Sequence, residues 1–498
     1  MPLSQPRDLA EPRQGHAAPV CSLAGRAPRL LLAMLIAVAL LRIGTADYSL
    51  WYDELASLEF ARQPIPRLWS EWMLRETNPP LFYTLLAGAI AWFGQDTVAV
   101  RLLPIATGLA GIWAAYLLGR SMADTRVGLV AAALLSLSAA HSDLSHQVRA
   151  YSLAHSAVLF ACLGMVGYLH RRSGKALLLY AAATLGALYA HTTLAIFAGL
   201  AALTMLWLLK GDRRAQLHVI FVNLGVLVLW GWWAAISLRQ MALPATNIDW
   251  ITAPSLMEAL DMTAVAYLPM YLRAPGPIGT ALLMGLFATA GAWVVRVRRP
   301  DVTLLAVLVA GAPLLLYVIS QRVPIFLPRT LSWASGPTLV LLALAVRQIR
   351  SPLVQFTATA ALLISSALGL AAWLPERQRD DWGAATAAIA RLPALPVIVG
   401  DDAVALALLK HPSSPGLAPV VVQSPWRERW AAGLYPGPHL SPDAARQHIR
   451  GRGCALVVSW GPMVPPVLVG ATARRLLPDG HAPEVLLVSL RGPSRCPG

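Results

Sequence analysis

Long apolar runs separated by short polar turns occupy the chain between residues 30 and 373. A helix that crosses a bilayer needs roughly 20 apolar residues, so the shorter runs are expected to extend into their flanks. We therefore predict a polytopic α-helical membrane protein with about 11 spans. The candidate spans are residues 30–43, 98–119, 127–140, 151–168, 176–190, 192–209, 217–238, 278–295, 302–320, 331–346 and 352–373.

A further apolar run, residues 79–94, is marginal for a full crossing. The distribution of basic residues decides its interpretation, because Lys and Arg concentrate in cytoplasmic loops. If the N-terminus is cytoplasmic and this run does not cross, all the basic turns fall on the cytoplasmic side. We therefore predict that residues 79–94 form an interfacial helix in the first outer loop, entered through Asn78 and two prolines. The basic turns are residues 120–126, 171–175, 210–214, 296–299 and 347–350.

The pattern changes after Trp373. Short apolar runs, such as PVIVG, APVVVQ, CALVVSW and EVLLVSL, alternate with helix-like stretches, which predicts a small α/β domain. The expected parts are a cytoplasmic tail (1–29), a transmembrane domain (30–374) and an extracytoplasmic α/β domain (375–498). The first span follows a basic segment and is interpreted as an uncleaved signal anchor rather than a cleaved signal peptide.

Composition agrees with a membrane protein. Hydrophobic residues make up 57% of the 498 residues and charged residues 13%, whereas a soluble protein carries roughly 25% charged residues. The net charge of +15 is spread over separate turns rather than one patch, so nucleic-acid binding is not expected. No metal-binding motif is present, so no cofactor is predicted and a need for a divalent metal stays open. Cys454 and Cys496 could pair in an oxidising compartment.

Two adjacent carboxylates, Asp53 and Glu54, follow the first span in the sequence LWYDELASLEF. They could belong to an ordinary solvated loop. However, they are surrounded by aromatic residues about ten residues beyond the first span, where limited water access can tune a carboxylate. A carboxylate in that setting can act as a general base toward a hydroxyl or an amine.

Two arginines stand at outer ends of spans, where the positive-inside rule disfavours them. Arg149 lies in HSDLSHQVRAYSL, with His146 before it and Tyr151 after it. Arg329 lies in PIFLPRTLSWASGP. Either arginine could be an interfacial anchor whose head group reaches water. Either could instead hold an anionic phosphate at the membrane edge.

Several of these segments together resemble the GT-C membrane glycosyltransferases. They are WYDELAS, TNPPLFYTLL, RLLPIATGLAGIWAAYLLGR and SHQVRAYSL, and the resemblance is strongest from about residue 30 to 169. The most similar branch is the bacterial family 39 type, related to protein O-mannosyltransferases and the lipid A aminoarabinose transferase. FLPRTLSWASGP resembles a family pattern less closely, and RDDWGAATAAI from Arg379 is similar to the junction with the outer domain.

The resemblance implies an inverting glycosyltransferase that moves a sugar from a polyprenyl-phosphate donor to a lipid, glycan or protein acceptor. Asp53 takes the place of the family's first-loop catalytic Asp, with Glu54 beside it, and Arg149 and Arg329 would hold the donor phosphate. The site residues implied to bind substrate are Asn78, Tyr83, His146 and Tyr151.

Two of these positions depart from the family pattern. Asn78 stands where the family usually has His, and Tyr151 stands where some relatives have Asp. The expected location is the inner (plasma) membrane, in contact with its lipids. The alternatives are a transporter or lipid flippase, for which charged residues and broken helices are expected in mid-membrane, and a non-catalytic membrane scaffold.

Overall fold

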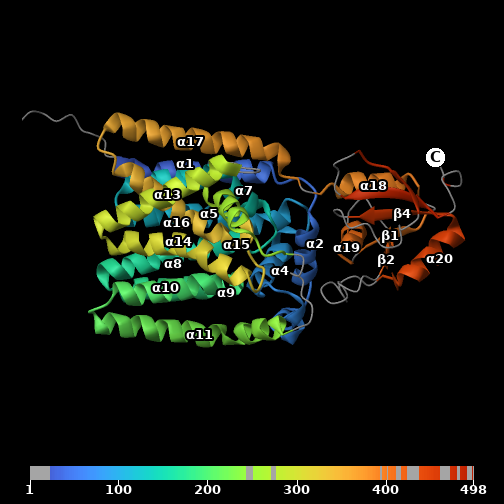
Figure 1. Cartoon of the computed structure of the whole chain (residues 1–498), viewed down its shortest axis with the longest axis horizontal. Helices are drawn as coiled ribbons and strands as arrows, with labels where there is room; N and C mark the ends of the chain where they lie inside the picture. Colours follow the sequence, from blue (N-terminus) through green and yellow to red (C-terminus); the bar gives the residue numbers. More distant parts are fainter. Residues whose placement is uncertain are drawn as a thin grey trace, which may run out of the picture.

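The structure is a computed structural model in which a long helical body carries a smaller sheet domain at one end (Figure 1). It describes residues 23–242, 251–270, 276–378, 380–392, 395–400, 402–410, 417–422, 437–459, 471–478, 483–490 and 496. Most of the predicted N-terminal tail, part of the outer loop after residue 242, and Arg379 of the predicted junction lie outside the described residues.

The helical body confirms the predicted fold class, because every predicted span coincides with an apolar helix. Eight helices of the described residues are long and apolar enough to cross a membrane, and the bent pair α6–α7 makes a possible ninth. Two further predicted spans, α9 and α10, have 17 and 15 residues. The number of crossings therefore stays a prediction.

The helices of the body have the following bounds: α1 Leu23–Gly44, α2 Tyr52–Ala61, α3 Ile65–Leu68, α4 Leu81–Phe93, α5 Leu102–Met122, α6 Thr125–Leu137, α7 Ala139–His146, α8 Tyr151–Arg171, α9 Gly174–Ala190, α10 Leu194–Leu208, α11 Arg213–Met241, α12 Leu256–Tyr267, α13 Gly276–Val297, α14 Pro300–Ser320, α15 Pro328–Leu331, α16 Ser335–Arg347 and α17 Pro352–Trp373.

The run predicted to be interfacial forms α4, which has 13 residues and begins directly after Pro80. A helix of that length rises only about 20 Å, which is less than the hydrocarbon core of a bilayer. It packs against α2, α5 and α9, and it ends with exposed Trp92 and Phe93. A short helix that packs across the ends of spans and exposes aromatic residues fits an interfacial position.

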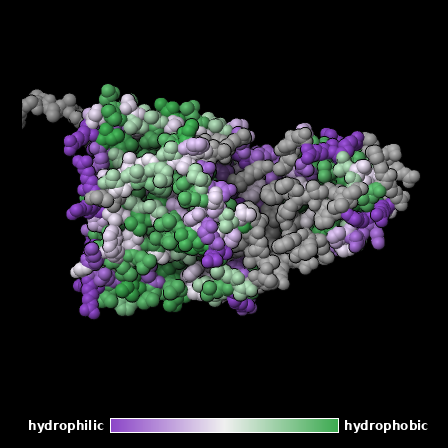
Figure 2. Space-filling view, in the orientation of Figure 1, coloured by the Kyte–Doolittle hydropathy of each residue, from purple (hydrophilic) through white to green (hydrophobic). Residues whose placement is uncertain are grey.

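The basic turns predicted to be cytoplasmic come together in space. Arg172 pairs with Asp212 at 3.1 Å, and Arg347 pairs with Asp124 at 2.9 Å. Arg299 donates a hydrogen bond to the carbonyl of Met122. Figure 2 shows a hydrophilic rim at one end of the helical body, an apolar band around its middle, and the sheet domain beyond the other end. This distribution is typical of a protein embedded in a bilayer.

The C-terminal domain is a six-stranded mixed sheet in the order β3-β2-β1-β4-β6-β5. Its first four strands in that order pair in parallel, and β6 pairs antiparallel with both β4 and β5. Helices α18 and α19 pack in one apolar cluster with the sheet, and α20 packs in another. The predicted small α/β domain is thus confirmed. Its elements are α18 Trp382–Ala390, β1 Val397–Val399, α19 Asp402–Lys410, β2 Val420–Val422, β3 His439–Leu440, α20 Pro442–Arg452, β4 Cys454–Ser459, β5 Thr472–Arg475 and β6 Glu484–Ser489.

Candidate active site

Helix α2 carries the adjacent acidic residues Asp53 and Glu54 in its first turn, where carboxylates interact favourably with the helix dipole. Glu54 points inward and is completely buried. Its carboxylate accepts hydrogen bonds from the backbone N–H groups of Trp51 (3.0 Å) and Val148 (2.8 Å) and forms an ion pair with Arg101 (2.9 Å). Glu54 therefore joins the start of α2 to the segment between α7 and α8.

Arg101 is the second half of this buried connection, and the sequence analysis did not single it out. Besides Glu54, its guanidinium group donates to the carbonyl groups of Ala46 (2.7 Å), Tyr48 (2.8 Å) and His146 (3.0 Å). Its charge also lies 3.8 Å from the centre of the Tyr48 ring. The available signal was an arginine at the start of a predicted span, at the end predicted to face outside, where the positive-inside rule disfavours arginine.

Asp53 is turned the other way and meets both predicted phosphate-binding arginines. Its Oδ2 atom lies 3.4 Å from Nη1 of Arg329 and 3.9 Å from Nε of Arg149. Arg149 also approaches Ser57, one turn along α2, at 3.4 Å. Residues 53, 149 and 329, far apart in the sequence, therefore form one cluster at the first turn of α2. Figure 1 shows α2 at the end of the helical body nearest the sheet domain.

The distances between Asp53 and the two arginines are long enough for these side chains to bind a ligand as well. A tight charge-assisted Arg–carboxylate contact is about 2.7–2.9 Å, so both contacts to Asp53 are long. The Oδ1 atom of Asp53 has no hydrogen-bond partner in the described part of the chain, and its side chain is 16% exposed. A carboxylate with one open oxygen can accept a proton, while two neighbouring guanidinium groups can bind an anion.

Three of the predicted substrate-binding residues border the cluster. The Tyr83 hydroxyl hydrogen-bonds to Glu76 and lies near Asp53 and Arg149. Asn78 donates to the same Glu76 carboxylate at 2.7 Å, just before the two prolines that begin α4. Tyr151, in the first turn of α8, packs its ring 5.4 Å from the ring of His191. All three side chains are buried, so they shape the site more than they extend into it.

His191, in the turn between α9 and α10, is a site neighbour that the sequence analysis did not select. Its Nδ1 atom accepts the backbone N–H of Thr193 at 3.3 Å, so the proton of the neutral ring sits on Nε2. Burial, followed by the positive charges of Arg149 and Arg329, lowers the pKa of His191 to about 3. The ring is therefore neutral at physiological pH and offers an N–H donor beside the two arginines.

His146 is separated from this cluster. Its Nδ1 atom lies 2.8 Å from the carbonyl oxygen of Ser142, its Nε2 atom lies 3.1 Å from that of Arg42, and its ring packs 5.4 Å from the ring of Trp373. These contacts join α7 to the ends of α1 and α17. No described contact brings the His146 side chain to Asp53, so its role in substrate binding stays a prediction, as does a catalytic role for Glu54.

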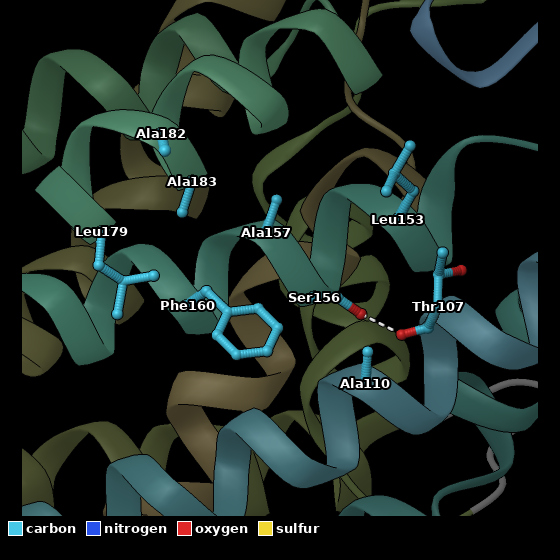
Figure 3. A pocket seen from close by; sticks show the side chains of 9 residues that line it. All are labelled: Thr107, Ala110, Leu153, Ser156, Ala157, Phe160, Leu179, Ala182 and Ala183. Atoms are coloured by element: carbon cyan, nitrogen blue, oxygen red, sulfur yellow. Dashed lines mark hydrogen bonds between the residues drawn. The ribbon is translucent and has the colours of Figure 1, made fainter. Parts of the chain in front are cut away.

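A groove of about 440 Å³ lies on the helical body between α5, α8 and α9 (Figure 3). Small side chains such as Ala110, Ala157 and Ala183 open it, and its lining is almost entirely apolar. Because its nine lining residues include no titratable side chain, this groove is not the reaction centre. Within the described residues, no group of three or more His, Cys, Asp or Glu side chains could hold a metal ion.

Comparisons with known proteins agree with this architecture. Residues 77–234 match the family model for dolichyl-phosphate-mannose-protein mannosyltransferase. A comparison with curated protein sequences finds no match. The fold is similar to crystal structures of ArnT from Cupriavidus metallidurans, with a TM-score of 0.62 in both the apo state (14% identity) and the undecaprenyl phosphate complex (15% identity). Each of these matches covers 95% of this chain and 100% of that chain.

A more distant similarity extends to the oligosaccharyltransferase of Archaeoglobus fulgidus, in a crystal structure with Zn and sulfate. Its TM-score is 0.52 at 12% identity, covering 86% of this chain and 68% of that chain. The shared fold and the family match confirm the relationship that the sequence motifs predicted. The chain is therefore a multi-pass membrane protein with the fold of ArnT, and its residues 77–234 are similar to the protein O-mannosyltransferases.

Proposed function

We propose that this protein is an inverting glycosyltransferase that moves a sugar from a polyprenyl-phosphate donor to an acceptor at the outer face of the membrane. The observation that carries the proposal is the cluster of Asp53 with Arg149 and Arg329. It combines one proton acceptor and two anion-binding groups at one end of a membrane-embedded helical body. Those are the parts that transfer from a lipid phosphate requires.

The reaction assigns one task to each group. Asp53 takes the proton from the acceptor hydroxyl or amine as that atom forms its bond to the anomeric carbon. The bond between the anomeric carbon and the phosphate oxygen breaks, and the electron pair leaves with the lipid phosphate. Arg149 and Arg329 stabilise the negative charge that develops there. Attack from the side opposite the phosphate inverts the anomeric configuration.

The neutral His191 ring fits the same phosphate site. Its Nε2–H can donate a hydrogen bond to a phosphate oxygen without adding a third positive charge beside the arginines. The ArnT structure with undecaprenyl phosphate supports a polyprenyl-phosphate ligand, since it has the same fold. The proposed sugar is a hexose or a pentose. The proposed acceptor is a lipid, a glycan or a protein.

Two observations support an outer face for this site. The basic turns gather at the opposite end of the body, which the positive-inside rule assigns to the cytoplasm. The sheet domain, next to the site, contains a disulfide between Cys454 and Cys496, and disulfides persist in oxidising compartments. On this assignment the N-terminus is cytoplasmic and residues 375–498 are extracytoplasmic, and the protein lies in the inner (plasma) membrane.

One feature of the helical body, the buried Arg42, could support the alternative function of a transporter. Arg42 is buried between helices and bonds to His141 (2.9 Å) and Ser145 (3.0 Å). Ionisable side chains inside a bundle can mark a transport path. Gly108, however, packs directly against Arg42 and Ser145, so these groups are enclosed by α5 rather than placed along an opening. This arrangement favours a structural role for Arg42 over a place in a transport path. It therefore favours a transferase over a transporter as the function of the protein.

The test is sugar transfer by membranes that contain matched amounts of wild type and of Asp53→Asn. Asp53→Asn keeps the shape but removes the basicity, and a general base contributes about 10²–10⁴ in rate. Asp47→Asn is the matched control, because Asp47 lies in the same loop and bonds to Thr97 instead of the arginines. Mass spectrometry of lipids and glycans from a deletion strain identifies the missing sugar. Equal transfer by wild type and Asp53→Asn would refute the catalytic assignment.

A further inference from the structure

Helix α19 of the sheet domain is apolar on all sides. Its sequence is DAVALALLK, and residues 404–408 are all almost completely buried. A helix that covers one face of a sheet normally keeps a polar outer side. Helix α20 of the same domain does so, since Ala445 and Ile449 are its buried residues. Helix α19 therefore needs a second apolar partner on the side away from its own sheet.

That partner is α2, the helix that carries Asp53. The two helices are in contact, and Figure 1 shows α19 beside α2 where the domain meets the helical body. Leu55 and Leu58 of α2 belong to the same buried apolar cluster as Val404 and Leu408 of α19. At 100° per residue, Leu55 and Leu58 lie about 200° and 140° around the helix from Asp53. They therefore occupy the face of α2 opposite the reactive carboxylate.

The helical body holds α2 at its first turn and near its end. The first turn is fixed through Glu54 and Arg101, and Phe60 packs on Tyr83 of α4 with ring centres 5.0 Å apart. Helix α2 has only 10 residues, and an isolated helix of that length is unstable in water. Its position relative to Arg149 and Arg329 therefore depends on packing against its neighbours, and α19 supplies part of that packing.

The junction between body and domain is also attached to the first outer loop. Arg377 donates a hydrogen bond to the carbonyl of Thr45 at 3.0 Å, and its charge lies 5.5 Å from the centre of the Tyr48 ring. Trp382, at the start of α18, is buried in the cluster that contains Leu55 and Leu58. The domain is thus attached to the segment of which α2 is the continuation.

We propose that the C-terminal domain positions the catalytic helix: α19 packs on Leu55 and Leu58 and holds Asp53 against the two arginines. This inference rests on the proposed transferase function and assigns the domain a part in it. Leu55 and Leu58 are positioning residues, since they touch neither substrate nor reacting atoms. A displacement of about 1 Å at a reacting group can lower a rate about a hundredfold, so the packing of α19 has a direct effect on turnover.

The experiment compares the double variant Leu55→Ala/Leu58→Ala with wild type in the full chain. We expect kcat to fall about tenfold to a hundredfold, while KM for the donor changes little because the arginines stand on other elements. Hydrogen exchange of residues 52–61 should accelerate. Ile449→Ala is the matched control, since it removes a buried side chain from the separate apolar cluster behind α20. The conservative Leu58→Met should retain near-wild-type kcat.

The outcomes separate the two proposals. If wild type transfers no sugar, the proposed function fails, while faster exchange of residues 52–61 in the double variant would still support the contact. If wild type is active and the double variant matches it in kcat and exchange, the positioning role is refuted. An equal loss of kcat in Ile449→Ala would also refute it, because general loosening of the domain would then explain the effect. If the double variant does not fold, Leu58→Ala alone gives the same comparison.

Discussion

The two adjacent carboxylates of α2 should respond differently to loss of charge, and Glu54 gives the sharper test. In Glu54→Gln the amide nitrogen replaces one oxygen that now accepts a hydrogen bond from Val148 or from Arg101. The new amide N–H group then faces the N–H donor of Val148 or of Arg101. The buried positive charge of Arg101 also has no negative charge from residue 54 to balance it. Breaking a buried ion pair by removing one partner costs about 3–5 kcal/mol.

The magnitude should fall near the lower end of that range. Arg101 keeps its hydrogen bonds to the carbonyl groups of Ala46, Tyr48 and His146, so about 3 kcal/mol of folding stability is the expected loss. The double variant Glu54→Gln/Arg101→Met should be less destabilised than the sum of the single variants, because it leaves no uncompensated charge. Asp53→Asn should change stability by no more than about 1 kcal/mol, since that carboxylate is partly exposed.

Cys162 provides the assay. It is a buried free cysteine, so a thiol-reactive fluorescent dye reports unfolding of the bundle as the purified protein is heated. Cys21, which lies outside the described residues, is replaced by Ser in every variant. A lower unfolding temperature for Glu54→Gln, with activity that follows the folded fraction, supports a structural role. A variant that unfolds at the wild-type temperature but transfers no sugar would show instead that Glu54 takes part in the reaction.

Three further predictions concern the arginines, pH and topology. Arg149→Ala and Arg329→Ala should each lower turnover about tenfold to a hundredfold, with partial rescue by Lys, which lacks the planar fork; wild-type turnover in both would make them anchors only. Because the pKa of His191 in the folded protein is about 3, below its ordinary value of about 6.5, the unfolded state takes up a proton first as the pH falls. Stability should therefore decrease below pH 6.5, and thermal unfolding should show a smaller decrease between pH 7 and 5 for His191→Gln; equal pH dependence would contradict a neutral buried ring. Alkaline phosphatase fused after Gly498 should be active and a fusion after Arg214 inactive, and the reverse result would invert the topology.

The sequence by itself determined the class of fold and selected three residues that the structure brings together, Asp53, Arg149 and Arg329. Apolar runs and basic turns predict helices and their orientation because the bilayer imposes length, and charge distribution follows loop position. The motifs around Asp53, Arg149 and Arg329 were sufficient to select these three residues, although they stand on three separate elements. The arrangement that brings both arginines within 4 Å of Asp53 is a property of the tertiary structure.

Only the tertiary structure distinguished the roles of neighbouring residues. Asp53 and Glu54 are adjacent and chemically similar, but successive residues of a helix point about 100° apart. Asp53 therefore faces Arg149 and Arg329, whereas Glu54 faces Arg101. The turn after α9 brings His191 close enough to Arg149 for the positive charge to lower the pKa of the ring, which no local pattern encodes. The apolar sequence of α19 signals burial on every side, but that its partner is the helix of Asp53 depends on contacts between segments almost 350 residues apart.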